Sequence, residues 1–477
     1  MKHYLIIDMG TGNSRIVLAR EDGEIVGLRH ISNKYLRDDT YPDSQYFDIQ
    51  DWKRKILSGA RDLLEEFADI RVDGITASGC RQSTAFLDDE GNSVYGIPNI
   101  DHRGRAYLHE LGDGKDIYRI TGKWLSTFPA GNLYAIKKKQ PELYARIKKL
   151  TSLSEWIGQV LTGKLVIEPS LACETQLFDI DKKQWSQELL DRYGFDRPLV
   201  PELANGGSLL GNITQQAKQM LGVSYDIPFV VGGGDTQNAV LGANSQIGDI
   251  TVVSGTTSPL FRHTKEHYYD EQQRCWVDLD FGGSSYFVET NPGVTGLNFQ
   301  RMKNSLFQDV SYEEMNSRMM EKETPAMCAS FTNLLFDTGA RVSKGGFFMG
   351  APWADSIDRF DYAAAVGGDI ACAIYENYLK LNRLLPYEKS YLRGCGGGFQ
   401  SEFICQTLAD LTGKDLLLPN GFSQSSVLGC VKLMNQYFGI AEETGDADFR
   451  IYHPSDRPFS KLYYEKWVEY RNIICNI

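Results

Sequence analysis

The sequence lacks any run of about 18 apolar residues, and this absence excludes a predicted membrane-spanning helix. The opening segment "MKHYLIIDMG" has an apolar run that is too short for a secretory signal and is interrupted by Asp8. Lys and Arg do not gather into a basic stripe, and the net charge is -12, so an electrostatic footprint for nucleic acid is missing. We therefore expect a cytoplasmic protein that has neither nucleic acid nor a membrane as a partner.

Paired metal-ligand spacings are also missing. The nine cysteines include no C-x-x-C pair, and the seven histidines include no H-E-x-x-H motif. We expect buried free thiols and no zinc-type site. No low-complexity linker divides the chain, so its domains should be closely coupled.

The length and the order of elements indicate a two-domain α/β protein. A chain of 477 residues exceeds the ~250 to 300 at which a single core stops growing. Strand-like and helix-like segments alternate, as in an α/β fold. A helical stretch ends in small and polar residues at "VLGANSQIGD", so we expect one domain over residues 1–243 and a second over 244–477.

Local patterns predict individual elements. Asp22-Gly23 between apolar runs predicts a hairpin. Apolar spacing predicts a helix over 51–68 and a helical stretch from about 132 to 163, with Gly163 as a C-cap. Alternating residues within 262–290 predict a β-excursion, and "KLYYEKWVEYRNIICNI" predicts an aromatic-rich terminal helix.

A turn at "LIIDMGTGNS" has the composition of a phosphate cradle. Its two glycines let backbone N–H groups approach a phosphate, and Asp8 at the strand end could hold Mg²⁺ through water. A dinucleotide-binding fingerprint is disfavoured, because Arg15 occupies the place of its third glycine and a hairpin follows. Taken alone, the segment fits a plain hairpin turn equally well.

A second copy of this design strengthens the phosphate interpretation. Residues 250–258, "ITVVSGTTS", repeat an apolar strand followed by Gly-Thr and hydroxyls, which suggests a duplicated fold. A third glycine cluster precedes a helix that should begin near Ser401, whose free N–H groups could meet phosphate or ribose. A tight strand-to-helix turn explains that third segment comparably well.

The stretch "FVVGGGDTQNAV" places three glycines between an apolar strand and Asp235. Local spacing alone favours a tight turn with Asp235 as the N-cap of the next helix.

The sequence contains four motifs in this order: "LIIDMGTGNSR", "VVGGGDTQNAVLGA", "VVSGTTSPL" and "GCGGGFQSEFICQTLADLTG". With these motifs, the chain resembles the FGGY family of carbohydrate kinases. The resemblance implies two RNase-H-like domains around an ATP cleft, a fold similar to hexokinase, actin and the Hsp70 ATPases. It further implies transfer of the γ-phosphoryl group of MgATP to a sugar or polyol, with Asp235 as general base.

The resemblance also assigns binding residues by position. Those implied for ATP are Gly10, Thr11, Gly12, Asn13, Arg15, Gly255, Thr256, Thr257, Gly397, Gly398 and Ser401. Those implied for the sugar are Arg81, Gln82, Asp101, Phe128, Asp235 and Gln237, and Asp8 is implied for Mg²⁺.

Departures from the family pattern leave the substrate open. Asn99 stands where the family has Trp, and the Phe-Gly-Gly-Tyr motif itself is absent. Autoinducer-2 kinases, L-fuculokinases and xylulokinases are comparably similar. An actin- or Hsp70-like ATPase, or an ATP-gated binding module, is the alternative from another class, although such a protein needs no sugar pocket. An NAD-dependent oxidoreductase is a weaker alternative, and a homodimer stays open.

Overall fold

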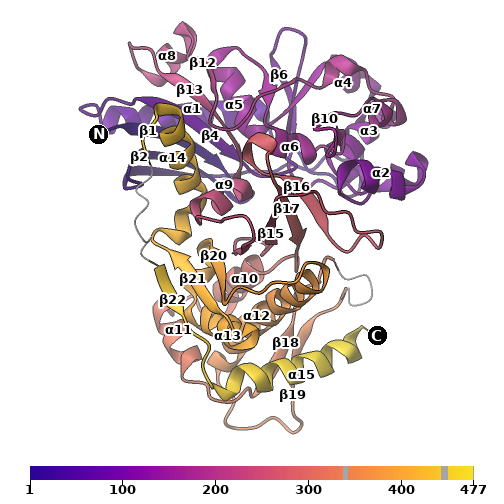
Figure 1. Ribbon diagram of the computed structural model, residues 1–477, viewed down its shortest axis with the longest axis vertical. Helices are drawn as coiled ribbons and strands as arrows, with labels where there is room; N and C mark the ends of the chain where they lie inside the picture. Colours follow the sequence, from indigo (N-terminus) through magenta and orange to yellow (C-terminus); the bar gives the residue numbers. More distant parts are fainter. Residues whose placement is uncertain (337–341, 442–448, 476–477) are drawn as a thin grey trace.

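The protein is built around two mixed β-sheets, which form the upper and lower lobes of Figure 1. The computed structural model describes residues 1–336, 342–441 and 449–475. The N-terminal lobe holds a sheet of order β12-β13-β4-β1-β2-β3, whose strands are β1 (His3–Met9), β2 (Asn13–Arg20), β3 (Ile25–Ser32), β4 (Gly74–Gly79), β12 (Leu209–Asn212) and β13 (Pro228–Gly234). The C-terminal lobe holds a sheet of order β16-β17-β15-β14-β20-β21-β22, whose strands are β14 (Ile250–Val253), β15 (Leu260–Thr264), β16 (Trp276–Leu279), β17 (Tyr286–Thr290), β20 (Tyr391–Cys395), β21 (Asp415–Pro419) and β22 (Phe449–Tyr452).

The two sheets share one topology. In the first, β1, β2 and β3 form an antiparallel meander, β4 and β13 continue parallel to β1, and β12 closes the edge antiparallel. In the second, β14, β15 and β17 form the meander, β20 and β21 run parallel to β14, and β22 closes the edge. Among the strands of these two sheets in the described part of the chain, only β16 has no counterpart. The predicted duplicated α/β fold is confirmed.

Helices cover both sheets (Figure 1). They are α1 (Ile49–Glu66), α2 (Gly114–Thr121), α3 (Pro129–Lys139), α4 (Pro141–Arg146), α5 (Leu153–Thr162), α6 (Pro169–Cys173), α7 (Gln187–Tyr193), α8 (Gln215–Leu221), α9 (Asp235–Gly242), α10 (Gly296–Leu306), α11 (Tyr312–Met320), α12 (Arg359–Leu384), α13 (Glu402–Thr412), α14 (Ser425–Phe438) and α15 (Pro458–Ile474). Further strands lie outside the two main sheets and include β5 (Thr84–Leu87), β6 (Ser93–Ile97), β7 (Lys149–Ser152), β18 (Met327–Ser330) and β19 (Gly346–Met349).

Most of the expected elements form as predicted. The Asp22-Gly23 hairpin joins β2 to β3, the 51–68 pattern becomes α1, and Gly163 ends α5 in the left-handed conformation. The 262–290 segment supplies strands of the second sheet, and α15 is the predicted terminal helix up to Ile474; its last predicted residues, 476–477, lie outside the described part of the chain.

Two local predictions are wrong in detail. The 132–163 stretch is not continuously helical, because Lys149–Ser152 form β7 and pair with β5. Cross-strand pairing overrides helical propensity there. Asp235 is also not an N-cap: Gly234 holds that position, Asp235 is the first helical residue, and no side chain caps α9.

Helix α14 links the two halves of the chain. It follows β21 of the second sheet but packs against β1, β4 and β13 of the first, where Val427, Val431 and Met434 join a core with Tyr4 and Ile6. It also crosses α9, its counterpart after β13. The C-terminal half therefore supplies one helix to the N-terminal lobe.

Strand β16 makes the second link. The Tyr118 hydroxyl donates to the Cys275 carbonyl at 2.8 Å, and the Val277 N–H donates to the Gly122 carbonyl at 3.0 Å. Lys123 also donates to the Val277 carbonyl, at 3.2 Å. The second sheet is thus attached to the N-terminal lobe along its β16 edge as well as through α14.

The described cysteines are free, and all but Cys475 are buried, which confirms the expected free thiols. Across the described ranges, none of the helices combines the length and the hydrophobicity needed to cross a bilayer.

Two buried glutamates of the N-terminal lobe should make stability depend on pH. Burial is the main cause that raises the pKa of Glu155 to about 7 and of Glu168 to about 8, and repulsion from the Glu155 carboxylate adds to the rise at Glu168. The folded protein therefore retains protons that the unfolded chain loses near its ordinary pKa of 4.5. Stability from these groups is fully present below that value and is lost as pH rises through about 8.

We expect Tm, followed by circular dichroism, to fall less between pH 5 and pH 9 in Glu168→Gln than in the wild type, because the amide does not ionise. The exposed Glu142, replaced by Gln, is the matched control and should follow the wild type. Parallel Tm–pH curves for wild type and Glu168→Gln would contradict the prediction.

Candidate active site

The carboxyl ends of three parallel strands meet at one edge of the first sheet. Asp8 of β1 pairs with Ser78 of β4, and Gly233 of β13 pairs with the same Ser78 from the other side. The segments that follow these strands carry the first glycine turn, Arg81 and Asp235. In open α/β sheets, ligands bind at this edge.

Backbone geometry explains the three glycines before Asp235. A Cβ on Gly232 would lie 1.8 Å from the Ala77 carbonyl oxygen of β4, and Gly233 has a φ of +118°. The register between β13 and β4 shifts between Val230 and Gly233. The bulge and the close approach both require residues without a side chain, and they set the direction in which the chain enters α9 at Asp235.

Asp235 is half-buried and keeps a raised pKa. Burial, followed by repulsion from Asp8, raises the pKa of Asp235 to about 6, while attraction to Arg81 and a hydrogen bond from Thr236 act in the opposite direction. The Thr236 hydroxyl lies 3.1 Å from Asp235 Oδ1. A carboxylate with a pKa nearer neutrality is a stronger base than an ordinary aspartate and is still ionised at pH 7.

The first glycine turn is tied to the start of α14. Arg15 pairs with Asp8 and donates to Ser426 at 2.9 Å and to Gln424, and the Ser426 hydroxyl donates to Asp8 Oδ2 at 3.0 Å. Gln424 and Ser426 contact residues of the candidate site and were not predicted from the sequence. Their only signal was the hydroxyl-rich "SQSS" at a helix start, which is also an ordinary helix-capping pattern.

Residues from two other segments hydrogen-bond to the same turn. Asn99, which replaces the family's Trp, donates from Nδ2 to the Thr11 hydroxyl at 2.9 Å. Asn33 and Tyr35 of the following strand region donate to the Thr11 carbonyl at 3.2 and 2.5 Å. Gly12 and Asn13 are exposed at its tip. Hydrogen bonds from three other residues therefore hold the turn at Thr11, while Gly12 faces open space.

The second and third glycine clusters meet at the corresponding edge of the second sheet. The Gly398 N–H donates to the Ser254 carbonyl at 2.9 Å, so the turn after β20 lies against the turn after β14. Gly255, Thr256 and Gly397 are exposed there. Ser401 caps α13 by accepting from the Ile404 N–H at 3.4 Å.

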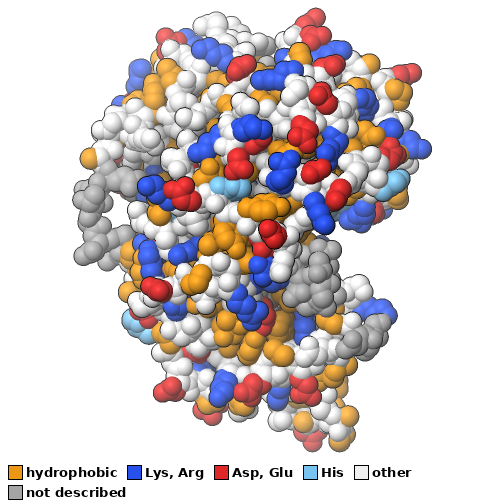
Figure 2. Space-filling view, turned by 45° about the vertical axis from the view of Figure 1, so that its right-hand side comes forward, with side chains coloured by type: hydrophobic (Ala, Val, Ile, Leu, Met, Phe, Trp, Pro, Cys, Tyr) orange, Lys and Arg blue, Asp and Glu red, His pale blue; other side chains and the backbone are white. Residues whose placement is uncertain are grey.

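The surface is hollowed between the two lobes, and acidic and basic side chains are interspersed on the face that Figure 2 shows. Both sheets direct turns of glycine and hydroxyl residues from the carboxyl ends of their strands, and the contacts of Arg15 with Gln424 and Ser426 join the two sets. A ligand that bridges these turns would touch both lobes.

Asp8, the residue predicted to hold Mg²⁺, has one carboxylate oxygen that is available to a ligand. Asp8 is 2% exposed, its Oδ2 accepts from Arg15 and Ser426, and its Oδ1 has no hydrogen-bond partner among the described residues. Mg²⁺ prefers oxygen ligands and keeps several waters, so one carboxylate that acts through water fits it. In the described ranges, no group of three or more His, Cys, Asp or Glu is placed to enclose a metal.

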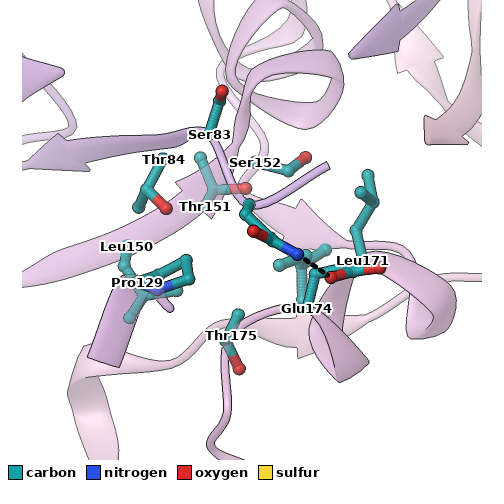
Figure 3. A pocket seen from close by; sticks show the side chains of 11 residues that line it. Ser83, Thr84, Pro129, Leu150, Thr151, Ser152, Leu171, Glu174 and Thr175 are labelled. Atoms are coloured by element: carbon teal, nitrogen blue, oxygen red, sulfur yellow. Dashed lines mark hydrogen bonds between the residues drawn. The ribbon is translucent and has the colours of Figure 1, made fainter. Parts of the chain in front are cut away.

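Arg81 and Gln82, which are predicted to bind the sugar, both donate hydrogen bonds to acidic side chains. Arg81 donates to Glu289 of β17 at 2.7 and 3.1 Å and to Glu174 at 3.1 Å. Gln82 donates to Glu174 at 3.0 Å, the bond drawn in Figure 3. Glu174 and Glu289 were missed from the sequence, where single acids in a polar segment carry no distinguishing signal.

The other predicted sugar residues are more buried than an open pocket wall. Asp101 is 1% exposed and accepts from Arg103 and from the Gln45 N–H, both at 2.7 Å. Phe128 is 1% exposed and packs against the Trp276 ring at 5.4 Å between centroids. Gln237 is 2% exposed, and both of its amide atoms lack partners in the described part of the chain. Gln237 thus has free hydrogen-bonding capacity, and the sugar roles of all three stay predictions.

A cavity of about 10 Å³ lies beside the Gln82–Glu174 bond, lined also by Ser83, Thr84 and Pro129 (Figure 3). Its volume is near the minimum that one water molecule requires. It is too small for a sugar, and the place of the sugar site stays a prediction.

Gly12→Ala tests the first turn without disturbing the fold. A Cβ at Gly12 would meet no atom within 4 Å, but it would project where a phosphate is predicted. We expect KM for ATP to rise about tenfold, a loss of ~1.4 kcal/mol, with Tm unchanged. Gly346→Ala, whose Cβ also meets open space, is the control. An unchanged KM would show that phosphate does not approach this turn.

The chain is similar to a family of known proteins. Residues 3–242 match the model for the N-terminal domain of the FGGY family of carbohydrate kinases. YoaC of Bacillus subtilis, named as a sugar kinase, is 35% identical over 98% of this chain and 96% of its own length. Autoinducer-2 kinase of Klebsiella pneumoniae is 28% identical over 94% of this chain and 88% of its own.

The fold is also that of a solved kinase. The structure of glycerol kinase from Plasmodium falciparum with ADP has a TM-score of 0.84 and 18% identity, covering 99% of this chain and 98% of that one.

Proposed function

Because the chain belongs to the FGGY family of carbohydrate kinases, which use ATP, we propose that it transfers the γ-phosphoryl group of MgATP to a hydroxyl of a small sugar or polyol, with Asp235 as general base. The observation that carries the residue assignment is the position of Asp235. It stands at the carboxyl end of β13, next to Arg81 and Asp8, with a pKa raised to about 6.

Asp235 removes the proton from the attacking hydroxyl. An aliphatic alcohol is a poor nucleophile at neutral pH, and a positioned base contributes typically ~10²- to 10⁴-fold. The base is ionised above its pKa, so it is ready to accept a proton at pH 7. Thr236 fixes one of its oxygens, which leaves the other for the substrate.

The glycine turns bind and orient the nucleotide. Exposed backbone at Gly12 and Gly397 supplies N–H groups for phosphate and ribose without interference from side chains. The N–H of the equally exposed Gly255 donates to the Thr257 carbonyl at 2.8 Å, so this turn would have to open that bond to reach a phosphate. Mg²⁺, held through water by Asp8, would neutralise charge on the transferring group. Arg15, held by Asp8 and Ser426, stands beside the same turn.

The test is ADP release by the full-length protein, with and without a panel of sugars that includes xylulose, L-fuculose and the linear dihydroxy-ketone of the autoinducer-2 type. We expect one of them to stimulate release and to appear as its phosphate by mass spectrometry. ATP hydrolysis that no sugar stimulates would overturn the kinase proposal and favour an actin- or Hsp70-like ATPase.

A further inference from the structure

An aromatic ring of the C-terminal lobe lies against the backbone that leads into Asp235. Phe281 stands at the tip of the β16–β17 hairpin, in the short 3-10 helix η3 (Phe281–Gly283). A Cβ added to Gly233 of β13 would lie 2.5 Å from Phe281 Cε1, and one added to Gly206 would lie 2.8 Å from Phe281 Cδ1. The ring therefore occupies the space that side chains on these two glycines of the N-terminal lobe would need.

Hydrogen bonds fix the tip of this hairpin. Asp280 accepts from the Ser285 N–H at 2.9 Å, which closes the turn. From the N-terminal lobe, the Lys183 ammonium donates to the Gly283 carbonyl at 2.6 Å. These bonds hold the backbone of the turn and attach it to the N-terminal lobe, so the half-buried Phe281 is presented to that lobe at a defined position.

The segment that the ring contacts is the bulge of β13. Gly233 has a φ of +118°, and the register between β13 and β4 shifts just before it. From the N-terminal lobe, the Ala77 carbonyl of β4 lies against Gly232, and the Glu168 carboxylate lies 3.4 Å from the position of a Cβ on Gly233. From the C-terminal lobe, the Phe281 ring lies against the same Gly233. Contacts from both lobes thus confine the bulge.

The backbone of the bulge sets the direction of the Asp235 side chain. Asp235 is the first residue of α9, two residues after Gly233, and Gly234 gives this helix no side-chain cap. The Thr236 hydroxyl lies 3.1 Å from Asp235 Oδ1, but Thr236 belongs to the same helical turn and moves together with it. A shift of the bulge would therefore turn the carboxylate away from the attacking hydroxyl.

We infer that Phe281 is a positioning residue for the general base: its ring fixes the bulge at Gly233 and, through the bulge, the direction of Asp235. The inference rests on the proposed kinase function. A catalytic group must be held within about 0.5 Å of its productive place by the residues that support it, and a misplacement of about 1 Å can cost ~10²-fold in rate. The C-terminal lobe thereby aligns a base that belongs to the N-terminal lobe.

A double-mutant cycle tests this role. It measures kcat for phosphorylation of the sugar that the ADP-release panel identifies, in Phe281→Ala, in Asp235→Asn and in the double variant. We expect Phe281→Ala to lower kcat about tenfold in the wild-type background and less than about twofold in the Asp235→Asn background, because the ring then has no base to align. The Kd of ATP, measured by calorimetry, should stay within about twofold of the wild-type value. An equal loss of kcat in both backgrounds would overturn the inference, and so would an unchanged kcat in Phe281→Ala.

Phe348→Ala is the matched control. Phe348 of β19 is also half-buried and stacks on the Tyr470 ring at 5.3 Å between centroids, and β19 lies at the bottom of the lower lobe in Figure 1, whereas β13 lies in the upper lobe. This variant should keep wild-type kcat.

A smaller substitution covers the case in which Phe281→Ala does not fold. Phe281→Leu keeps an apolar side chain but lacks the ring edge that reaches Gly206, so we expect kcat to fall about threefold, again only where Asp235 is present. Wild-type kcat in a folded Phe281→Leu protein would then overturn the inference. If no sugar of the panel is phosphorylated, the proposed function is overturned, and this inference with it.

Discussion

Asp235→Asn is expected to lower sugar phosphorylation by about 10²- to 10⁴-fold, the range that a positioned general base contributes. Asparagine keeps the shape of the side chain and can still accept from Thr236, but it cannot take a proton from the attacking hydroxyl. ATP affinity should persist, because the predicted nucleotide turns do not include this side chain. The measurements are kcat from coupled ADP release and the Kd of ATP by calorimetry.

The pH profile provides an independent readout of the same residue. The base works only when ionised, and the pKa of Asp235 is raised to about 6, so kcat/KM of the wild type should fall as pH drops through about 6. The residual activity of Asp235→Asn should lose this acidic limb. A structural role for Asp235 would lower activity without removing the limb.

Asp226→Asn is the matched control, because this aspartate is 69% exposed in its side chain and pairs with Lys218 just before the amino end of β13, at the opposite end of the strand from Asp235. It should retain wild-type kcat. Near-wild-type turnover in Asp235→Asn would contradict the assignment of the base, and another acid at this edge of the sheet would then be the candidate.

The backbone parts of the site follow from local sequence. Glycines and hydroxyls directly after apolar runs predict turns at strand ends, and the two copies of that pattern predict the duplicated sheet topology. The bulge at Gly233 is likewise a local feature, because a backbone conformation with this positive φ favours glycine at that position in the sequence. These features were predictable because their causes lie within a few residues.

Side-chain partners across the cleft were not predictable in this way. Glu289 lies 208 residues from Arg81, and Ser426 lies 418 residues from Asp8. No local sequence pattern relates residues so far apart along the chain. An acidic residue in a strand is expected to face solvent unless a buried cation lies opposite it, and the sequence does not show which cation that is. Asp101 shows the converse: family resemblance assigns it to the sugar, while the fold places it in a buried ion pair with Arg103.

Gly429→Ala is expected to damage both stability and activity, because α9 and α14 touch at reciprocal glycines. A Cβ on Gly429 would lie 2.0 Å from the Asn238 carbonyl oxygen of α9, and one on Gly242 would lie 2.1 Å from the Ser425 carbonyl oxygen of α14. Backbone atoms cannot rotate aside, so the helices must separate. Overpacking of this kind costs typically ~1–3 kcal/mol, measured as a lower free energy of unfolding.

The catalytic consequence follows from where the two helices begin. Helix α9 starts at Asp235, and α14 starts at Ser425, beside the Ser426 that holds Asp8 and Arg15. Separating them displaces the base relative to the phosphate turn, and a misplacement of about 1 Å can cost ~10²-fold in rate. We therefore expect kcat to fall by more than the loss of folded protein explains. The concentration of folded active sites is measured by active-site titration, and kcat is calculated from it. Gly346→Ala, which adds the same methyl into open space, should keep wild-type kcat and Tm. A Gly429→Ala protein with both values unchanged would mean that the helices can part at this crossing without moving Asp235.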